Sequence, residues 1–134
     1  MKPLAIHHVT INVADVDEAT RFYTDVLGLT ERSDRPGFDQ PRVVWLDAGG
    51  QQLHLVERET TPAFGQHFAI RVSDITAAVA DVRGHGVEVR EPNGVGAALQ
   101  TFLNDPWGNV IELQQVAAVD DDPAYPQALS GSAG

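Results

Sequence analysis

The stretch His8-Val-Thr-Ile-Asn-Val-Ala-Asp15 decides the fold, because the chain carries a second copy of it, His67-Phe-Ala-Ile-Arg-Val-Ser-Asp74. The match continues downstream in the same order. Gly49 follows His8, and Gly108 follows His67, after the same number of residues. A collinear repeat of this length indicates two copies of one supersecondary unit.

Each copy predicts a strand, then a helix, then further strands. The β-branched strand ends at an aspartate that suits a helix N-cap. After Asp15, apolar residues recur at helical spacing as far as Gly28, which suits a left-handed C-terminal cap. The same pattern follows Asp74 and ends at Gly84 or Gly86. Further strands are predicted at 42–47, 52–57, 87–90, 99–104 and 109–116. Residues 31–41 and 91–98 are predicted to be polar loops, and residues 117–134 a mobile acidic tail.

Composition limits the function classes. The 134 residues are 43% hydrophobic, which suits one globular domain. The formal charge of −10 argues against nucleic-acid and anionic membrane partners. Because the chain has no cysteine, disulfides, thiolate nucleophiles and sulfur-ligated metals are excluded. No apolar run has the length of a membrane helix or the form of a signal segment, so we expect a cytoplasmic protein.

Strand alternation predicts a cluster of polar side chains on the sheet face that the helices leave open. His8 and His67 occupy equivalent positions in the two copies, and so do His54 and Glu112. Each of these residues alone is better explained as lining a solvated face. The four together, in register with the repeat, favour a metal site of three imidazoles and one carboxylate. That donor set suits zinc, nickel, iron, cobalt or manganese.

Longer motifs resemble the vicinal oxygen chelate superfamily, which includes glyoxalase I, fosfomycin-resistance proteins, methylmalonyl-CoA epimerase, extradiol dioxygenases and bleomycin-resistance proteins. The resemblance covers about 4–116. Besides the two repeated stretches, it is carried by Arg21-Phe-Tyr-Thr-Asp-Val-Leu-Gly-Leu29 and by Phe102-Leu-Asn-Asp-Pro-Trp-Gly-Asn-Val-Ile-Glu-Leu113.

The resemblance implies an α+β fold of two βαβββ modules, at about 4–58 and 66–116, whose curled mixed sheets form a metal-binding cleft. It also implies ligands on the first and last strands of each module, and a homodimer. The cleft then lies either within one chain or between subunits.

The chemistry that the resemblance implies is chelation of a small-molecule substrate through two adjacent oxygens by a divalent metal, as in lactoylglutathione lyase, with stabilisation of an enediolate-like intermediate. Glyoxalase I carries a glutamate where this chain has His54. This histidine is therefore predicted either to fill a fourth ligand position or to act as a general base, with Glu112 as the second catalytic residue. Arg71, Trp45 and Gln100 are candidate substrate contacts. His7, on the apolar face, is assigned no metal role.

Two alternatives stay open at this point. An iron-dependent extradiol-type dioxygenase would use His8, His67 and Glu112 as a two-histidine, one-carboxylate triad. A metal-free protein of the bleomycin-resistance type would bind a small molecule in an aromatic-lined groove. The complete ligand set argues against the second of these.

Overall fold

A computed structural model describes residues 1–34, 39–96 and 98–116, so the tail predicted at 117–134 lies outside the described residues. The chain divides into two compact units. Of the described residues, the first unit comprises Met1–Phe68 and Asn104–Ile111, and the second comprises Ala69–Leu103 and 112–116.

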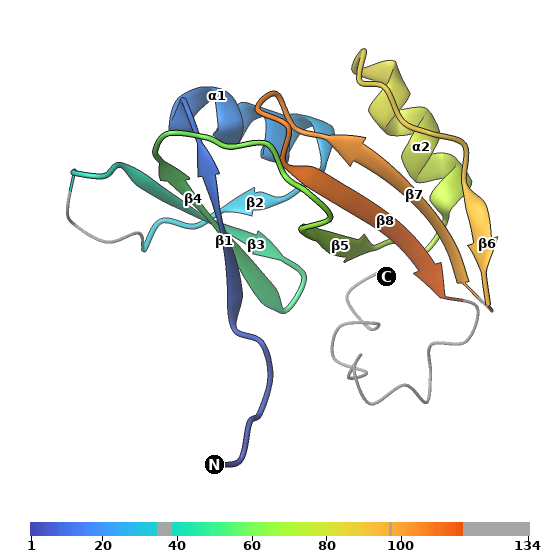
Figure 1. Cartoon of the computed structure of the whole chain (residues 1–134), viewed down its shortest axis with the longest axis horizontal. Helices are drawn as coiled ribbons and strands as arrows, with labels where there is room; N and C mark the ends of the chain where they lie inside the picture. Colours follow the sequence, from blue (N-terminus) through green and yellow to red (C-terminus); the bar gives the residue numbers. More distant parts are fainter. Residues whose placement is uncertain (35–38, 97, 117–134) are drawn as a thin grey trace. The chain divides into compact units, whose positions relative to one another are not determined.

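The structure contains two βαβββ modules, each built on a four-stranded sheet (Figure 1). The elements of the first module are β1 (His8–Val13), α1 (Val16–Arg21), the π-helical turn η1 (Phe22–Val26), β2 (Thr30–Glu31), β3 (Val43–Ala48) and β4 (Gln51–Glu57). Those of the second are β5 (His67–Arg71), α2 (Ile75–Gly84), β6 (Asn93–Val95), β7 (Ala98–Asn104) and β8 (Val110–Val116). The strand orders are β1-β4-β3-β2 and β5-β8-β7-β6, so the two sheets share one topology. The α+β prediction is confirmed.

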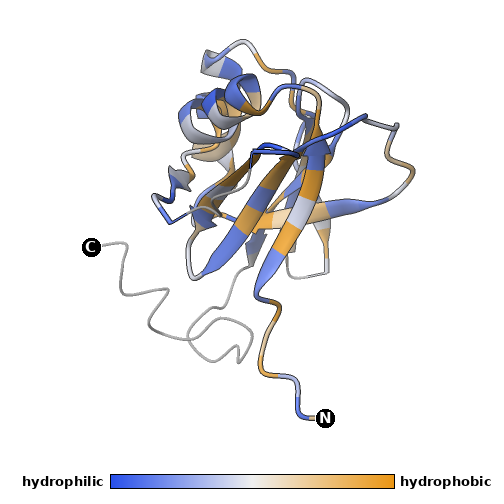
Figure 2. Ribbon diagram, turned by 90° about the vertical axis from the view of Figure 1, so that its left-hand side faces the viewer, coloured by the Kyte–Doolittle hydropathy of each residue, from blue (hydrophilic) through white to orange (hydrophobic). Residues whose placement is uncertain are grey.

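The first sheet is mixed, because β1 runs parallel to β4 while β3 runs antiparallel to both β4 and β2. Its register places Thr10 of β1 and Trp45 of β3 on either side of His54 in β4. Hydrophobic and hydrophilic residues alternate along the strands, as Figure 2 shows. The alternation produces one buried face, which includes Val13, Leu53 and Leu55.

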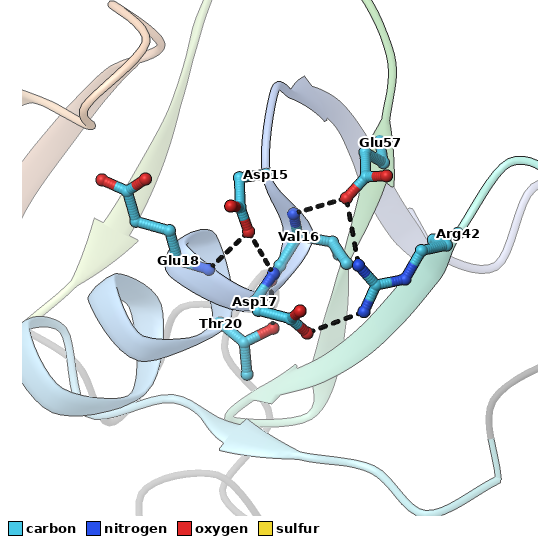
Figure 3. A network of polar contacts seen from close by, with 7 residues as sticks. All are labelled: Asp15, Val16, Asp17, Glu18, Thr20, Arg42 and Glu57. Carbon is cyan, nitrogen blue, oxygen red and sulfur yellow. Dashed lines mark hydrogen bonds and ion pairs between the residues drawn. The ribbon is translucent and has the colours of Figure 1, made fainter.

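Both helices begin with an aspartate cap and with a hydrogen bond to a side chain from the last strand of their module. In the first module the Asp15 carboxylate accepts from two backbone amides of the first turn, and Glu57 Oε2 accepts from the amide of Val16 at 3.0 Å (Figure 3). In the second module Gln115 Oε1 accepts from the amide of Ile75 at 2.8 Å. A side chain from the last strand of each module thus satisfies the first free amide of its helix. This repetition supports the internal repeat.

Four local predictions need correction. The strand predicted at 87–90 is absent. There Thr101 Oγ1 donates to the carbonyl of Arg90 at 2.6 Å, so a side-chain bond replaces part of a strand ladder. Strand β6 lies instead within the loop predicted at 91–98, and β2 includes the first residue of the loop predicted at 31–41. The first helix leaves α-geometry after Arg21 and continues as η1, although Gly28 has the predicted positive φ of 74°.

Each unit has its own buried apolar residues. The large, fully buried side chains of the first unit are Tyr23, Leu46, Leu55, Val13, Val16 and Ile111. In the second, α2 buries Ile75, Val79 and Val82. Within the described part of the chain, no helix is both long and apolar enough to cross a membrane.

Candidate functional site

Three rings form a stack on the first sheet. The ring of His54 lies parallel to that of His8, with centroids 4.0 Å apart and planes 15° apart. On its other side it stacks on Trp45, at 4.7 Å and 14°. His54 is therefore only 8% exposed, although it lies on the face opposite the buried Leu53 and Leu55. The structure thus brings together two of the predicted ligands and one predicted substrate contact.

The hydrogen bond of His54 fixes which ring nitrogen carries its lone pair. Its Nε2 lies 2.9 Å from Oε1 of Gln52. Because an amide oxygen only accepts, Nε2 carries the hydrogen and Nδ1 is left as the acceptor or ligand atom. Burial lowers the pKa of His54 below its usual value, and the neighbouring His8, His7 and Arg32 lower it further. The ring is therefore neutral near pH 7, as a metal ligand or general base must be.

His67 has the opposite tautomer. Its Nδ1 lies 2.8 Å from the backbone carbonyl oxygen of Gly65, so Nδ1 donates and Nε2 carries the lone pair. Gly65 has a φ of +76°, in the left-handed region that favours glycine. A histidine that ligates a metal typically donates its second nitrogen to a carbonyl or carboxylate oxygen in this way.

His7 makes a contact that the sequence did not indicate. Its Nδ1 lies 2.9 Å from Nδ1 of His8, and the two rings meet edge to face. His7 is exposed rather than packed on the apolar face, because β1 begins only at His8 and strand alternation does not extend to the residue before it. His7 can therefore orient His8 through a ring nitrogen.

The remaining predicted site residues belong to the second unit. Glu112 lies in β8 between the buried Ile111 and Leu113 and is itself only 8% exposed. Arg71 ends β5, and Gln100 lies in β7. Convergence of Glu112 with the three histidines stays a prediction.

The donor set fits a transition metal in its chemistry. His54 donates a hydrogen bond from Nε2 and His67 from Nδ1, and the second nitrogen of an imidazole is the atom that binds a metal. Among residues 1–34, 39–96 and 98–116, however, no three histidine or acidic side chains form a group that could hold an ion. The parallel rings of His8 and His54 also have to turn before both can bind one ion, because an imidazole binds a metal in its own plane.

A cavity of about 270 Å³ lies beside β1 in the first unit. Its lining includes His67, together with Thr10 and Asn12 of β1. Val9 and Ile11, which alternation predicts to face the helix, line it as well, and Val9 is 37% exposed. Among the described residues that line the cavity, His67 is the candidate metal ligand, and Thr10 is the register partner of His54.

The motifs that carry the family resemblance meet in a buried hydrogen-bond network. The hydroxyl of Tyr23 donates to Asp105 Oδ2 at 2.9 Å. The same carboxylate accepts from the amides of Trp107 and Asn109, at 2.9 Å each, and from the Asn109 side chain at 2.7 Å. Burial, and then the charge and hydrogen bond of Asp105, raise the pKa of the Tyr23 phenol well above its usual range. These residues therefore hold the turn at 105–109 in place.

Comparison with known proteins agrees with this architecture. The chain is 34% identical over 125 residues to the uncharacterized protein YaeR of Escherichia coli, covering 82% of this chain and 95% of that protein. It is 32% identical over 123 residues to the lactoylglutathione lyase of Haemophilus influenzae, covering 81% and 90%. The chain spans only 43% and 34% of the length of two related Arabidopsis thaliana proteins, a lactoylglutathione lyase and a probable chloroplastic one.

A solved structure shares both fold and sequence features. TnmS3, an antibiotic binding protein from a Streptomyces species, superposes with a TM-score of 0.74 and 27% identity, over 87% of this chain and 99% of that one. Residues 5–113 match the family model described as Glyoxalase/Bleomycin resistance protein/Dioxygenase superfamily. The chain belongs to this superfamily.

Proposed function

We propose that the chain is a metal-dependent enzyme of the lactoylglutathione lyase type that acts on a small oxygenated metabolite. The observation that carries the proposal is the pair of stacked histidines, His8 and His54, on the first sheet, with the neutral ring of His54 fixed by Gln52. The similarity to the Haemophilus influenzae lyase supports it.

The proposed metal ligands are His8, His54, His67 and Glu112, and the ion is zinc, nickel, iron, cobalt or manganese. Such an ion, when bound, stabilises negative charge that develops on two adjacent substrate oxygens. The homodimer that the family resemblance implies also stays a prediction.

The residues around His54 suit proton transfer. Its Nδ1 carries the lone pair, and Gln52 holds the ring by Nε2. Trp45 covers one face of the ring and limits the access of water. His54 is thus proposed to take a proton from the substrate at Nδ1, either as a free base or after leaving a ligand position.

A second candidate is a metal-free small-molecule binding protein. The stack of Trp45, His54 and His8 favours it, because parallel rings offer a surface for a planar ligand. The likeness to TnmS3, an antibiotic binding protein, supports it as well. In this function His54 would keep its stacked position and no ion would be bound.

Elemental analysis distinguishes the two candidates. The purified protein is compared with a His67→Ala/Glu112→Ala double variant and with His85→Ala, which removes an exposed histidine outside the proposed site. The enzyme proposal predicts about one transition-metal ion per chain in the parent and in the His85 control. It also predicts loss of the ion in the double variant. If no protein binds zinc, nickel, iron, cobalt or manganese after incubation, the enzyme proposal fails and the binding protein is favoured.

A further inference from the structure

Two consecutive histidines at the start of β1 bring two ring nitrogens together. Nδ1 of His7 lies 2.9 Å from Nδ1 of His8, and the two rings meet edge to face with their planes 86° apart. Only one hydrogen can lie between these nitrogens, so one of them donates and the other accepts. When the donor ring moves this hydrogen to its own Nε2, both Nδ1 atoms present lone pairs, which can bind one metal ion.

Contacts with the first sheet hold both histidines in place. The carbonyl of His7 accepts from the amide of Gln52 at 3.3 Å, so its main chain is attached to β4 although β1 begins only at His8. The ring of His8 stacks on that of His54 at 4.0 Å. Because β1 is an edge strand of its sheet and both histidines are exposed, an ion from solution can reach them.

The orientation of His54 separates this pair from the proposed four-ligand set. A ring nitrogen binds a metal in the plane of its own ring, and the rings of His8 and His54 are stacked with their planes 15° apart. An ion in the plane of His8 therefore lies outside the plane of His54. Within the described part of the chain, no third histidine or acidic side chain completes a group with the pair, so water is the ligand for the remaining positions.

The spacing of the two nitrogens indicates the kind of ion. Two metal–nitrogen bonds of about 2.05 Å that meet at a right angle end about 2.9 Å apart, whereas the same bonds at a tetrahedral angle end about 3.3 Å apart. The 2.9 Å between the Nδ1 atoms matches the right angle. Right angles are typical of tetragonal and square-planar copper(II) and nickel(II), while zinc prefers a tetrahedron.

We propose that His7 and His8 form a site for copper(II) or nickel(II), which they bind through their Nδ1 atoms. The site stands apart from the proposed function, because His7 is not one of its ligands. A neutral imidazole has one lone pair, so His8 binds either this ion or the metal of the four-ligand set. Copper bound at His7 and His8 therefore leaves the four-ligand set without His8.

Copper(II) titration of a variant that lacks the four-ligand set tests the proposal. His67→Ala/Glu112→Ala serves as the reference, and calorimetry and electron paramagnetic resonance follow the binding. We expect about one copper ion per chain, coupled to two imidazole nitrogens. Adding His7→Ala should weaken binding by about tenfold or more and leave one coupled imidazole. His67→Ala/Glu112→Gln, which keeps the shape of the buried side chain, is the reference if the first double variant does not fold.

Two control substitutions locate the copper ion. Adding His85→Ala, which removes an exposed histidine at the end of α2, should change neither the affinity nor the imidazole count. Adding His54→Ala should leave two coupled imidazoles, and loss of one would show that copper joins His8 to His54 and would overturn the proposal. Unchanged affinity after His7→Ala, or equal weakening by His85→Ala, would overturn it as well.

A comparison of nickel with zinc tests the geometry. Nickel(II) should bind the reference variant more tightly than zinc, because the nitrogens are spaced for a right angle. Zinc binding as tight as that of nickel, and insensitive to His7→Ala, would contradict the assignment of the ion.

Discussion

Replacing Tyr23 with phenylalanine removes one buried hydroxyl and nothing else. The side chain is fully buried, so the ring keeps its packing, while Asp105 loses the donor at 2.9 Å. Both oxygens of the Asp105 carboxylate accept hydrogen bonds, and a hydrogen bond to a carboxylate contributes about 1.5–3 kcal/mol. Three donors remain on the carboxylate. We therefore expect Tyr23→Phe to lower the free energy of unfolding by about 2 kcal/mol.

Urea denaturation followed by circular dichroism measures this change. A loss of about 2 kcal/mol reduces the folding equilibrium constant by roughly 30-fold. The slope of the unfolding free energy against urea concentration should stay unchanged. Asp105→Asn should lower the free energy of unfolding by more than Tyr23→Phe does, because the amide nitrogen of asparagine would replace an acceptor oxygen and face a hydrogen-bond donor. The double variant should cost less than the sum of the two single changes. Since neither residue belongs to the proposed site, metal content should stay that of the parent. A loss below about 0.5 kcal/mol for Tyr23→Phe would refute the reasoning.

Three further predictions concern other parts of the first unit. Because the pKa of His54 is lowered in the folded protein, the unfolded chain binds a proton at this residue more readily. The contribution of His54 to stability should therefore be complete above about pH 6.5 and fall as the pH drops below it. Denaturation measured over a pH series should show a weaker pH dependence for His54→Gln than for the parent. Nitrogen-15 NMR should show the ring hydrogen on Nε2 of His54 and on Nδ1 of His67, and one shared tautomer would contradict the hydrogen bonds described. Thermal denaturation should show that Glu57→Gln lowers the free energy of unfolding by less than about 1 kcal/mol, because the glutamine oxygen can still accept from the amide of Val16, as Gln115 does for the second helix. Glu57→Ala, which removes the acceptor, should lower it by about 1–2 kcal/mol. Equal losses of stability in Glu57→Gln and Glu57→Ala would contradict a role of Glu57 as hydrogen-bond acceptor for the first helix.

The sequence predicted the fold where patterns are long and repeated. The aspartates at 15 and 74 cap their helices as their positions indicated. Strand alternation is enough to place His8 and His54 on one face of the first sheet. Strand β6 could not be predicted, because Asn93-Gly-Val95 is short, contains a glycine and has no alternation.

Contacts between residues that are far apart in the chain could not be predicted from the sequence. Tyr23 and Asp105 are 82 residues apart, and their motifs were recognisable without any sign that they bind each other. Gln52 precedes His54 by two residues, so strand alternation puts both on one face, but only the side-chain geometry shows that Gln52 fixes the ring tautomer. The contact of His7 with His8 follows from where β1 begins, which patterns locate only to within a residue or two.

X-ray absorption spectroscopy of the metal-loaded protein tests the central claim most directly, because the outer-shell signal counts the imidazoles around an ion. The parent should show a mixed nitrogen and oxygen shell with about three imidazoles, near 2.0–2.1 Å for zinc. His54→Ala should show one imidazole fewer, and His85→Ala should match the parent. An unchanged imidazole count in His54→Ala, or a shell of water oxygens alone, would contradict the assignment of a metal site to this chain's histidines.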